Sequence, residues 1–88
     1  MRVWFMYDCH TFAKVGDGSS SREQMEARAR ELFAEDGCGS LFARDSNGRQ
    51  ITYCHGQRQP NGRYGISDDA LAAFFNRVEE HANWEARG

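Results

Sequence analysis

The most constraining feature of this chain is an amphipathic pattern near its C-terminal end, directly after Ser67-Asp68-Asp69. Serine caps the first turn of a helix, and acidic residues in that turn favour the positive end of the helix dipole. Apolar residues then recur at the spacing of one helix face, and they are Leu71, Phe74, Phe75, Val78 and Ala82. A stripe this wide is stable only when another element covers it, so the rest of the chain must supply a matching apolar layer.

A second helix is predicted over residues 22–36. Ser20 with Glu23, or Ser21 with Gln24, forms a capping box that satisfies free amides of the first turn. The apolar residues of this segment lie at the spacing of one buried face, and they are Met25, Ala29, Leu32 and Phe33. Gly37 is the residue expected to end the helix in a left-handed conformation.

Residues 2–10 alternate in the manner of a β-strand, and Asn47-Gly48 separates two further strand-like segments, residues 40–46 and 49–55. That dipeptide favours a two-residue type I′ turn. The turn sets a register in which Phe42 faces Tyr53, Leu41 faces Cys54 and Arg44 pairs with Ile51. We expect residues 11–21 to form a polar loop, because glycine and serine dominate them. Pro60-Asn61-Gly62 predicts a return through a short strand at residues 63–66.

These elements predict one α+β domain over residues 1–88, in the order β-α-β-β-(β)-α, with both helices on one face of a small antiparallel sheet. The inner face is expected to carry Val3, Phe5, Tyr7, Phe42, Ile51 and Tyr53. The opposite face is then expected to carry Trp4, Met6, Leu41, Ala43, Thr52 and Cys54. An apolar patch of that kind is either covered by a loop or the second hairpin, or used for binding.

Composition excludes several classes of protein. A formal net charge of -2 disfavours a general nucleic-acid binder. The apolar run at residues 3–7 ends at Asp8, so it is too short for a signal-peptide core or a membrane span. Three cysteines without C-x-x-C spacing do not suggest a secreted disulfide scaffold. We therefore expect a cytoplasmic protein without a membrane segment and without a bound cofactor.

Two Cys-His dipeptides raise the alternative of a small metal-binding protein. The candidate ligands are Cys9, His10, Cys38, Cys54 and His55. Adjacent residues of a strand point to opposite faces, so a regular sheet brings at most two of the strand ligands together. The same residues would form a cysteine-histidine pair if the first strand lay beside residues 49–55. No local motif supplies the orienting group or the oxyanion site of a thiol enzyme, and we expect a protein without enzymatic activity.

The second alternative is a nucleic-acid-binding domain that uses residues 44–66. This segment holds four arginines and one aspartate, with Tyr53, His55 and Tyr64 between them. Basic and aromatic side chains together can hold a phosphate backbone and stack a base. The strands followed by Gly65 and a capped helix resemble the second half of a double-stranded-RNA-binding domain. That family places lysines at the start of this helix, whereas this chain has Asp68 and Asp69, which repel phosphates.

The class that remains is a protein-binding module, an adaptor or inhibitor that acts through surface complementarity. The residues expected to contact the partner are Trp4, Met6, Arg44, Arg49, Arg58, Arg63, Tyr64 and Trp84. The partner is another protein or protein complex, or a second copy of the chain in a homodimer. The layout is similar to that of several small phage-encoded inhibitors, including some anti-CRISPR proteins, which suggests a phage or mobile-element origin.

Overall fold

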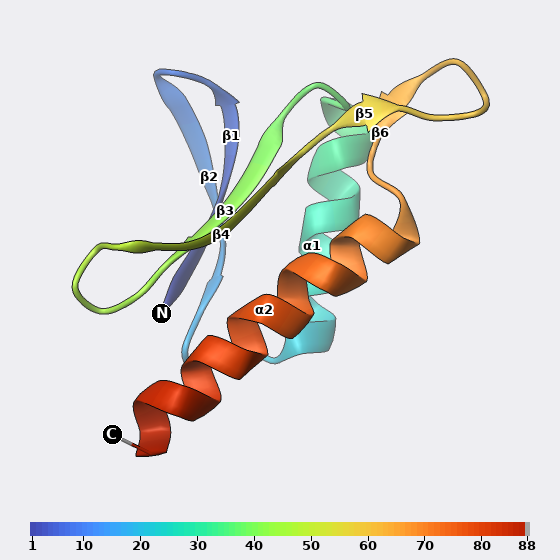
Figure 1. The fold of residues 1–88 in the computed structure, drawn as a ribbon. Helices are drawn as coiled ribbons and strands as arrows, with labels where there is room; N and C mark the ends of the chain where they lie inside the picture. Colours follow the sequence, from blue (N-terminus) through green and yellow to red (C-terminus); the bar gives the residue numbers. More distant parts are fainter. Residues whose placement is uncertain (88) are drawn as a thin grey trace.

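The computed structural model, which describes the backbone of residues 1–87 and the side chains of residues 1–81, confirms the predicted α+β class (Figure 1). The strands are β1 (Arg2–Asp8), β2 (Thr11–Asp17), β3 (Ser40–Arg44), β4 (Gln50–His55), β5 (Gln57–Arg58) and β6 (Tyr64–Gly65). The helices are α1 (Arg22–Glu35) and α2 (Asp68–Arg87). The predicted order is therefore correct except for two additional strands: β2, between the first strand and the first helix, and the short β5, which precedes the predicted return strand.

Strand β2 corrects the prediction of a polar loop over residues 11–21. It pairs antiparallel with β1 and forms one edge of a four-stranded antiparallel sheet of order β2-β1-β3-β4. The reversal between β1 and β2 is tight, because the Asp8 carboxylate accepts a hydrogen bond from the His10 amide at 2.7 Å. Gly16 lies within β2 and pairs with Val3, whereas Gly18 and the three serines follow the strand. The glycine and serine content therefore marks the turn after β2, and not a loop over the whole segment.

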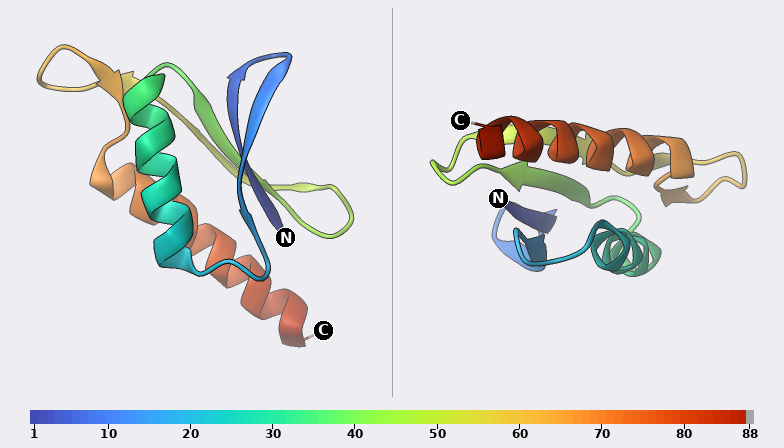
Figure 2. Two further views of the ribbon diagram at one scale, coloured as in Figure 1. Left: turned by 180° about the vertical axis from the view of Figure 1, so that it is seen from behind. Right: turned by 90° about the horizontal axis from the view of Figure 1, so that it is seen from below.

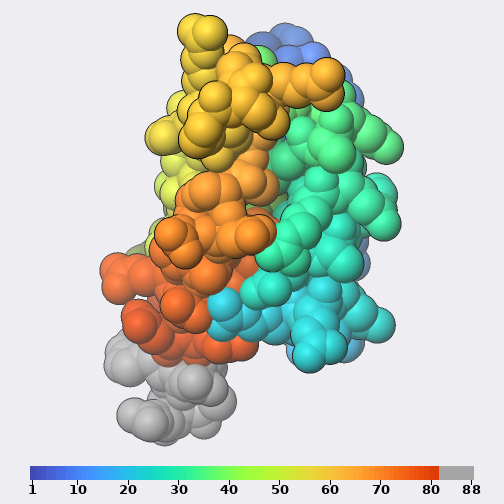
Figure 3. Space-filling model, turned by 90° about the vertical axis from the view of Figure 1, so that its right-hand side faces the viewer, coloured from blue at the N-terminus to red at the C-terminus, as the bar shows by residue number. Residues whose placement is uncertain are grey.

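Both helices pack on one face of this sheet, and the other face has no helix (Figure 2). Phe5 lies in the core between the sheet and the helices. It is fully buried, and its ring meets the Phe33 ring of α1 edge to face with the centroids 4.9 Å apart. In Figure 3 the two helices lie side by side, with the β5–β6 segment at one end of them. Arg22 on α1 ties them together through Glu79 on α2, at 2.9 Å.

The sheet faces correct the predicted burial of the hairpin residues. Strand β1 pairs with β3 so that Phe5 faces Leu41 and Trp4 faces Phe42, and paired residues point to the same side. Leu41, Ala43 and Cys54 therefore lie on the helix side, where Leu41 and Ala43 are completely buried. Phe42 and Tyr53 lie on the opposite side, beside Trp4. The predicted positions of Val3, Phe5, Tyr7 and Ile51 on the helix side are confirmed.

The β3–β4 turn differs from the predicted type I′ form. Gly48 has a φ of 80°, but no non-glycine residue has a positive φ, so Asn47 does not adopt the conformation that a type I′ turn needs. Instead the Asp45 carboxylate accepts hydrogen bonds from the amides of Asn47 and Arg49, both at 2.9 Å. The register shifts by one residue at this end, so that Arg44 pairs with Gln50 rather than Ile51. The predicted pairs of Phe42 with Tyr53 and of Leu41 with Cys54 are confirmed.

The helix caps are mostly those predicted. Ser21 and Gln24 form the capping box of α1, and the Ser67 hydroxyl accepts a hydrogen bond from the Ala70 amide at the start of α2. Gly37 is not left-handed, and α1 ends at an Asp36 C-cap whose amide donates to the Leu32 carbonyl. Strands β5 and β6 form the return predicted after Pro60-Asn61-Gly62, as a separate two-stranded sheet. Trp84 and Ala82 lie outside the described side chains.

Candidate binding surface

The helix-free face of the sheet carries a group of large side chains, which we call the outer face. Its members are Trp4, Met6, Phe12, Phe42 and Tyr53. Phe12 and Tyr53 are 48% and 45% exposed, whereas Phe42 is only 7% exposed because its neighbours on the same face cover it. Trp4 and Met6 are half-buried. Part of this apolar surface thus remains in contact with water, mainly at Phe12 and Tyr53, because both helices cover the other side of the sheet.

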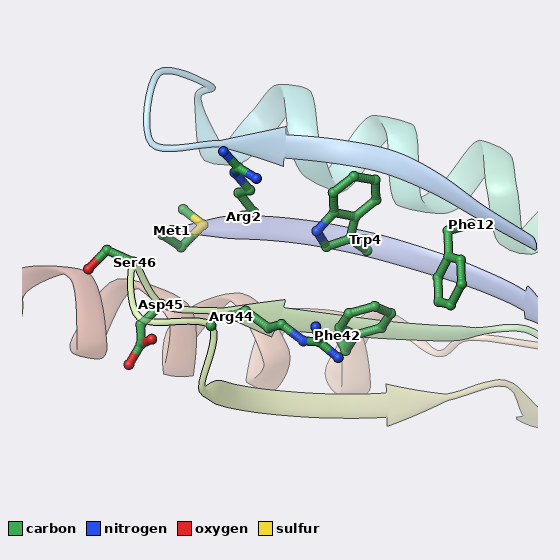
Figure 4. Close-up of a pocket in the computed structure, with 9 residues that line it drawn as sticks. Met1, Arg2, Trp4, Phe12, Phe42, Arg44, Asp45 and Ser46 are labelled. Carbon is green, nitrogen blue, oxygen red and sulfur yellow. The ribbon is translucent and has the colours of Figure 1, made fainter. Parts of the chain in front are cut away.

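A shallow depression of about 670 Å³ lies at one end of the outer face, next to the β3–β4 turn (Figure 4). Its lining includes Arg2, Trp4, Phe12, Phe42, Arg44 and Ser46. The Phe12 and Phe42 rings meet edge to face with their centroids 6.0 Å apart. The Arg44 guanidinium lies 5.2 Å from the Phe42 ring centroid, which is cation–π distance. The depression therefore combines an aromatic floor with cationic groups at its edge.

The charge at this edge is not neutralised within the described part of the chain. Arg2 and Arg44 have no carboxylate within ion-pair distance there, whereas four helix arginines each have one. Asp45 also lines the depression, but its carboxylate is held by the backbone amides of the turn and lies 3.8 Å from the His81 imidazole of α2. These amide hydrogen bonds, above all that from Arg49, lower the pKa of Asp45 and keep it ionised.

A hydrogen-bonded group at the other end of the outer face was not anticipated from the sequence. The buried Ser40 hydroxyl lies 3.2 Å from the Tyr53 hydroxyl and 3.2 Å from Nδ1 of His55, and the last two atoms are 3.3 Å apart. Because two hydroxyls share one ring nitrogen and no described carboxylate hydrogen-bonds the imidazole, the group lacks the orienting residue of a catalytic triad. It joins β3 to β4 and fixes the Tyr53 ring.

The residues proposed as metal ligands or as a thiol-imidazole pair are dispersed. Cys9 and His10 are exposed at the β1–β2 turn, and Cys38 is exposed ahead of β3. Cys54 packs toward the helices, where burial raises the pKa of its thiol to about 11. Strand β3 separates β1 from β4, so neither dipeptide meets the other across neighbouring strands. Within the described residues no three metal-ligating side chains come together.

The predicted arginine-rich hairpin is not one surface. Arg44 and Arg49 lie at the β3–β4 turn, and Arg58, Arg63 and Tyr64 lie in the β5–β6 hairpin at the opposite end of the molecule (Figure 1). All five side chains are exposed. Of these, only Arg44 lines the depression of the outer face, so the structure divides the predicted contact residues into two separate regions.

Comparison of the chain with protein-family models, with curated sequences and with solved structures finds no match. Among the described residues, neither helix combines the length and the apolar character that crossing a membrane requires. The functional conclusion consequently rests on the geometry and chemistry of the outer face.

Proposed function

We propose that this protein is a non-enzymatic protein-binding module, an adaptor or inhibitor that captures a partner protein on its outer face. The observation that carries the proposal is the partly exposed aromatic group around Trp4 on a sheet whose other side is covered by both helices. Exposed Phe12 and Tyr53 contribute nothing to the core between the sheet and the helices. Aromatic side chains bordered by arginine are the residues that dominate binding energy at protein interfaces.

The arrangement suits a partner segment that lies across the strands. Trp4 and Phe42 sit side by side on neighbouring strands, and Met6 continues the apolar surface along β1. The partner would bury an apolar side chain against this floor and exclude water from it. The phage or mobile-element origin and the cytoplasmic location expected from the sequence belong to this proposal, and three free cysteines support a reducing compartment.

A random-peptide display selection against the purified protein tests the proposal, with binding of the selected peptides measured by fluorescence polarisation. The double variant Trp4→Ala with Phe12→Ala is expected to lose the binding of most selected peptides while keeping its fold. Tyr64→Ala is the matched control, because this tyrosine is 56% exposed but lies in the β5–β6 hairpin. Unchanged binding by the double variant, or loss in Tyr64→Ala alone, contradicts the proposal.

A second candidate function is favoured by the arginines next to the aromatic floor. Single-stranded nucleic acids bind to surfaces where bases stack on aromatic rings and cations meet the phosphates. This candidate replaces the predicted use of residues 44–66, since Arg44 alone of that segment's arginines lines the depression of the outer face. Saturable binding of a fluorescein-labelled 15-mer of thymidine, with an affinity that falls steeply between 50 and 200 mM salt, would support it.

A further inference from the structure

We infer that the segment captured in the depression of the outer face is acidic, with a carboxylate held by Arg2 and Arg44 while an apolar side chain packs on Trp4 and Phe42. The inference rests on the proposed function and specifies the chemistry of the partner. It concerns one end of the outer face, where the depression lies beside the β3–β4 turn (Figure 4).

The arginines of this molecule differ in whether they form ion pairs with carboxylates. On the helices, Arg22 contacts Glu26 and Glu79 at 2.7 and 2.9 Å, and Arg30 contacts Asp68 at 3.1 Å. Arg28 and Arg77 also have glutamate partners. By contrast, the arginines of the depression have no carboxylate partner among the described residues. Arg49, Arg58 and Arg63 have no carboxylate partner among the described residues either, but only Arg2 and Arg44 line the depression. Their guanidinium groups can therefore bind a carboxylate of a ligand that occupies it.

An aromatic ring holds the Arg44 side chain at the edge of the depression. Its guanidinium lies over the Phe42 ring at 5.2 Å from the centroid, and this contact restricts the side chain without using its N–H donors. A planar guanidinium presents these donors as a fork that matches a carboxylate. The acidic side chain in the lining of the depression, Asp45, is already occupied by the turn amides and by its contact with His81. Its carboxylate does not compete for Arg44.

The distribution of cations on the outer face favours an acidic peptide over a nucleic acid. A phosphate backbone needs cations along the whole length of the face, whereas here the unpaired cations are confined to one end. Lys14, the remaining cation of the neighbouring strand, is bound to Asp17 at 2.9 Å. The far end of the face presents Ser40, Tyr53 and His55 joined to one another. A cationic site at one end of an apolar surface therefore matches a ligand that carries one carboxylate within an apolar peptide segment.

Three fluorescein-labelled peptide mixtures test the inference by fluorescence polarisation. In each mixture, Phe, Leu, Tyr and Gly are randomised at alternate positions, and the intervening positions are fixed as Glu, Gln or Lys. The Glu mixture is expected to bind about tenfold more tightly than the Gln mixture, as a hydrogen bond to a charged group predicts. The Lys mixture is expected to bind more weakly than both.

Charge-reversal variants then locate the effect. Arg2→Glu with Arg44→Glu is expected to abolish the preference for the Glu mixture and to favour the Lys mixture. Arg58→Glu with Arg63→Glu is the matched control, because these arginines are also exposed and have no carboxylate partner among the described residues, but lie in the β5–β6 hairpin. The control variant is expected to keep the wild-type preference. Thermal unfolding confirms that each variant is folded.

The outcomes separate the inference from the proposed function. If all three mixtures bind equally and Trp4→Ala weakens each of them, the acidic partner is wrong and the protein-binding function stands. If none binds to the wild-type protein, or Trp4→Ala has no effect, the proposed function fails as well. Binding of a thymidine 15-mer in preference to every peptide mixture overturns the inference in favour of a nucleic acid. A stable dimer in light scattering, dissociated by Trp4→Ala, overturns it in favour of a second copy of the chain.

Discussion

Replacing two phenylalanines on opposite faces of the sheet gives very different expected losses of stability. Phe5 is fully buried between β1 and α1, where it contacts Phe33 at 4.9 Å, and Phe12 is 48% exposed on the outer face. Truncation of a core phenylalanine to alanine costs about 3 to 5 kcal/mol, because the lost transfer energy and the cavity add together. Complete burial of a phenylalanine contributes roughly 1.5 to 3 kcal/mol, so half-burial of Phe12 contributes about 1 kcal/mol. No cavity forms there, because the site is open to water.

Urea unfolding followed by far-ultraviolet circular dichroism measures both losses. A domain of this size has a total stability of roughly 4 to 13 kcal/mol, so Phe5→Ala is expected to lose a large part of it. Phe5→Leu, which keeps part of the packing, is expected to lose about 1 to 2 kcal/mol and provides a folded comparison. Phe12→Ala is expected to lose about 1 kcal/mol, or about 4 to 8 °C in Tm. A loss of 3 kcal/mol or more at Phe12 would mean that the outer face is part of the core, and the reasoning about it would be refuted.

Three further predictions concern other parts of the molecule. Gly56→Ala is expected to destabilise the fold strongly, because its new methyl group would overlap the Gly37 carbonyl oxygen, whereas Gly18→Ala meets no atom within 4 Å and is expected to be neutral in thermal unfolding. Iodoacetamide at pH 8 is expected to modify Cys54 far more slowly than the two exposed cysteines, because burial raises its pKa to about 11; three rapid adducts in the intact mass would contradict this. The pKa of Asp17 lies below its ordinary value of 3.8, mainly through the hydrogen bond from a lysine ammonium, so its contribution to stability is present above that pH and is lost as the pH falls further. The Tm of the wild-type protein is accordingly expected to fall more between pH 5 and pH 2 than the Tm of Asp17→Asn, and parallel curves would show that the ion pair has no effect.

The elements that the sequence predicts well are those whose signals are local. Both helices begin at the predicted caps. In each, a serine side chain accepts a hydrogen bond from the backbone amide three residues later, and this local contact fixes the start of the helix. The central register of the β3–β4 hairpin is also local, since short turns leave few ways to pair two strands. The predicted type of turn was wrong. The Asp45 carboxylate accepts hydrogen bonds from two backbone amides and so stabilises a longer turn than Asn47-Gly48 alone favours.

The features that the sequence could not predict depend on contacts between distant segments. Which face of β3 is buried is decided by its pairing with β1, which places Leu41 beside Phe5 and leaves Phe42 outside. Large apolar residues lie on both faces of β3, since Phe42 is on one and Leu41 on the other. The alternation of apolar and polar residues therefore does not predict which face is buried. The residues of the outer face were therefore predicted in part: Trp4, Met6 and Arg44 were among the expected contact residues, whereas Phe12 was assigned to a loop. A strand signal was present in residues 12–15, which alternate, but the glycines that follow obscured it.

The most direct test of the binding surface is an amide chemical-shift map of the 15N-labelled protein titrated with the Glu-containing peptide mixture. The largest shifts are expected at the amides of β1, the first half of β2 and the β3–β4 turn, with Trp4, Phe12 and Arg44 among them. The amides of α1 and of the β5–β6 hairpin are expected to remain unchanged. Saturable shifts confined to the helices or to that hairpin would contradict the assignment of the outer face as the binding surface.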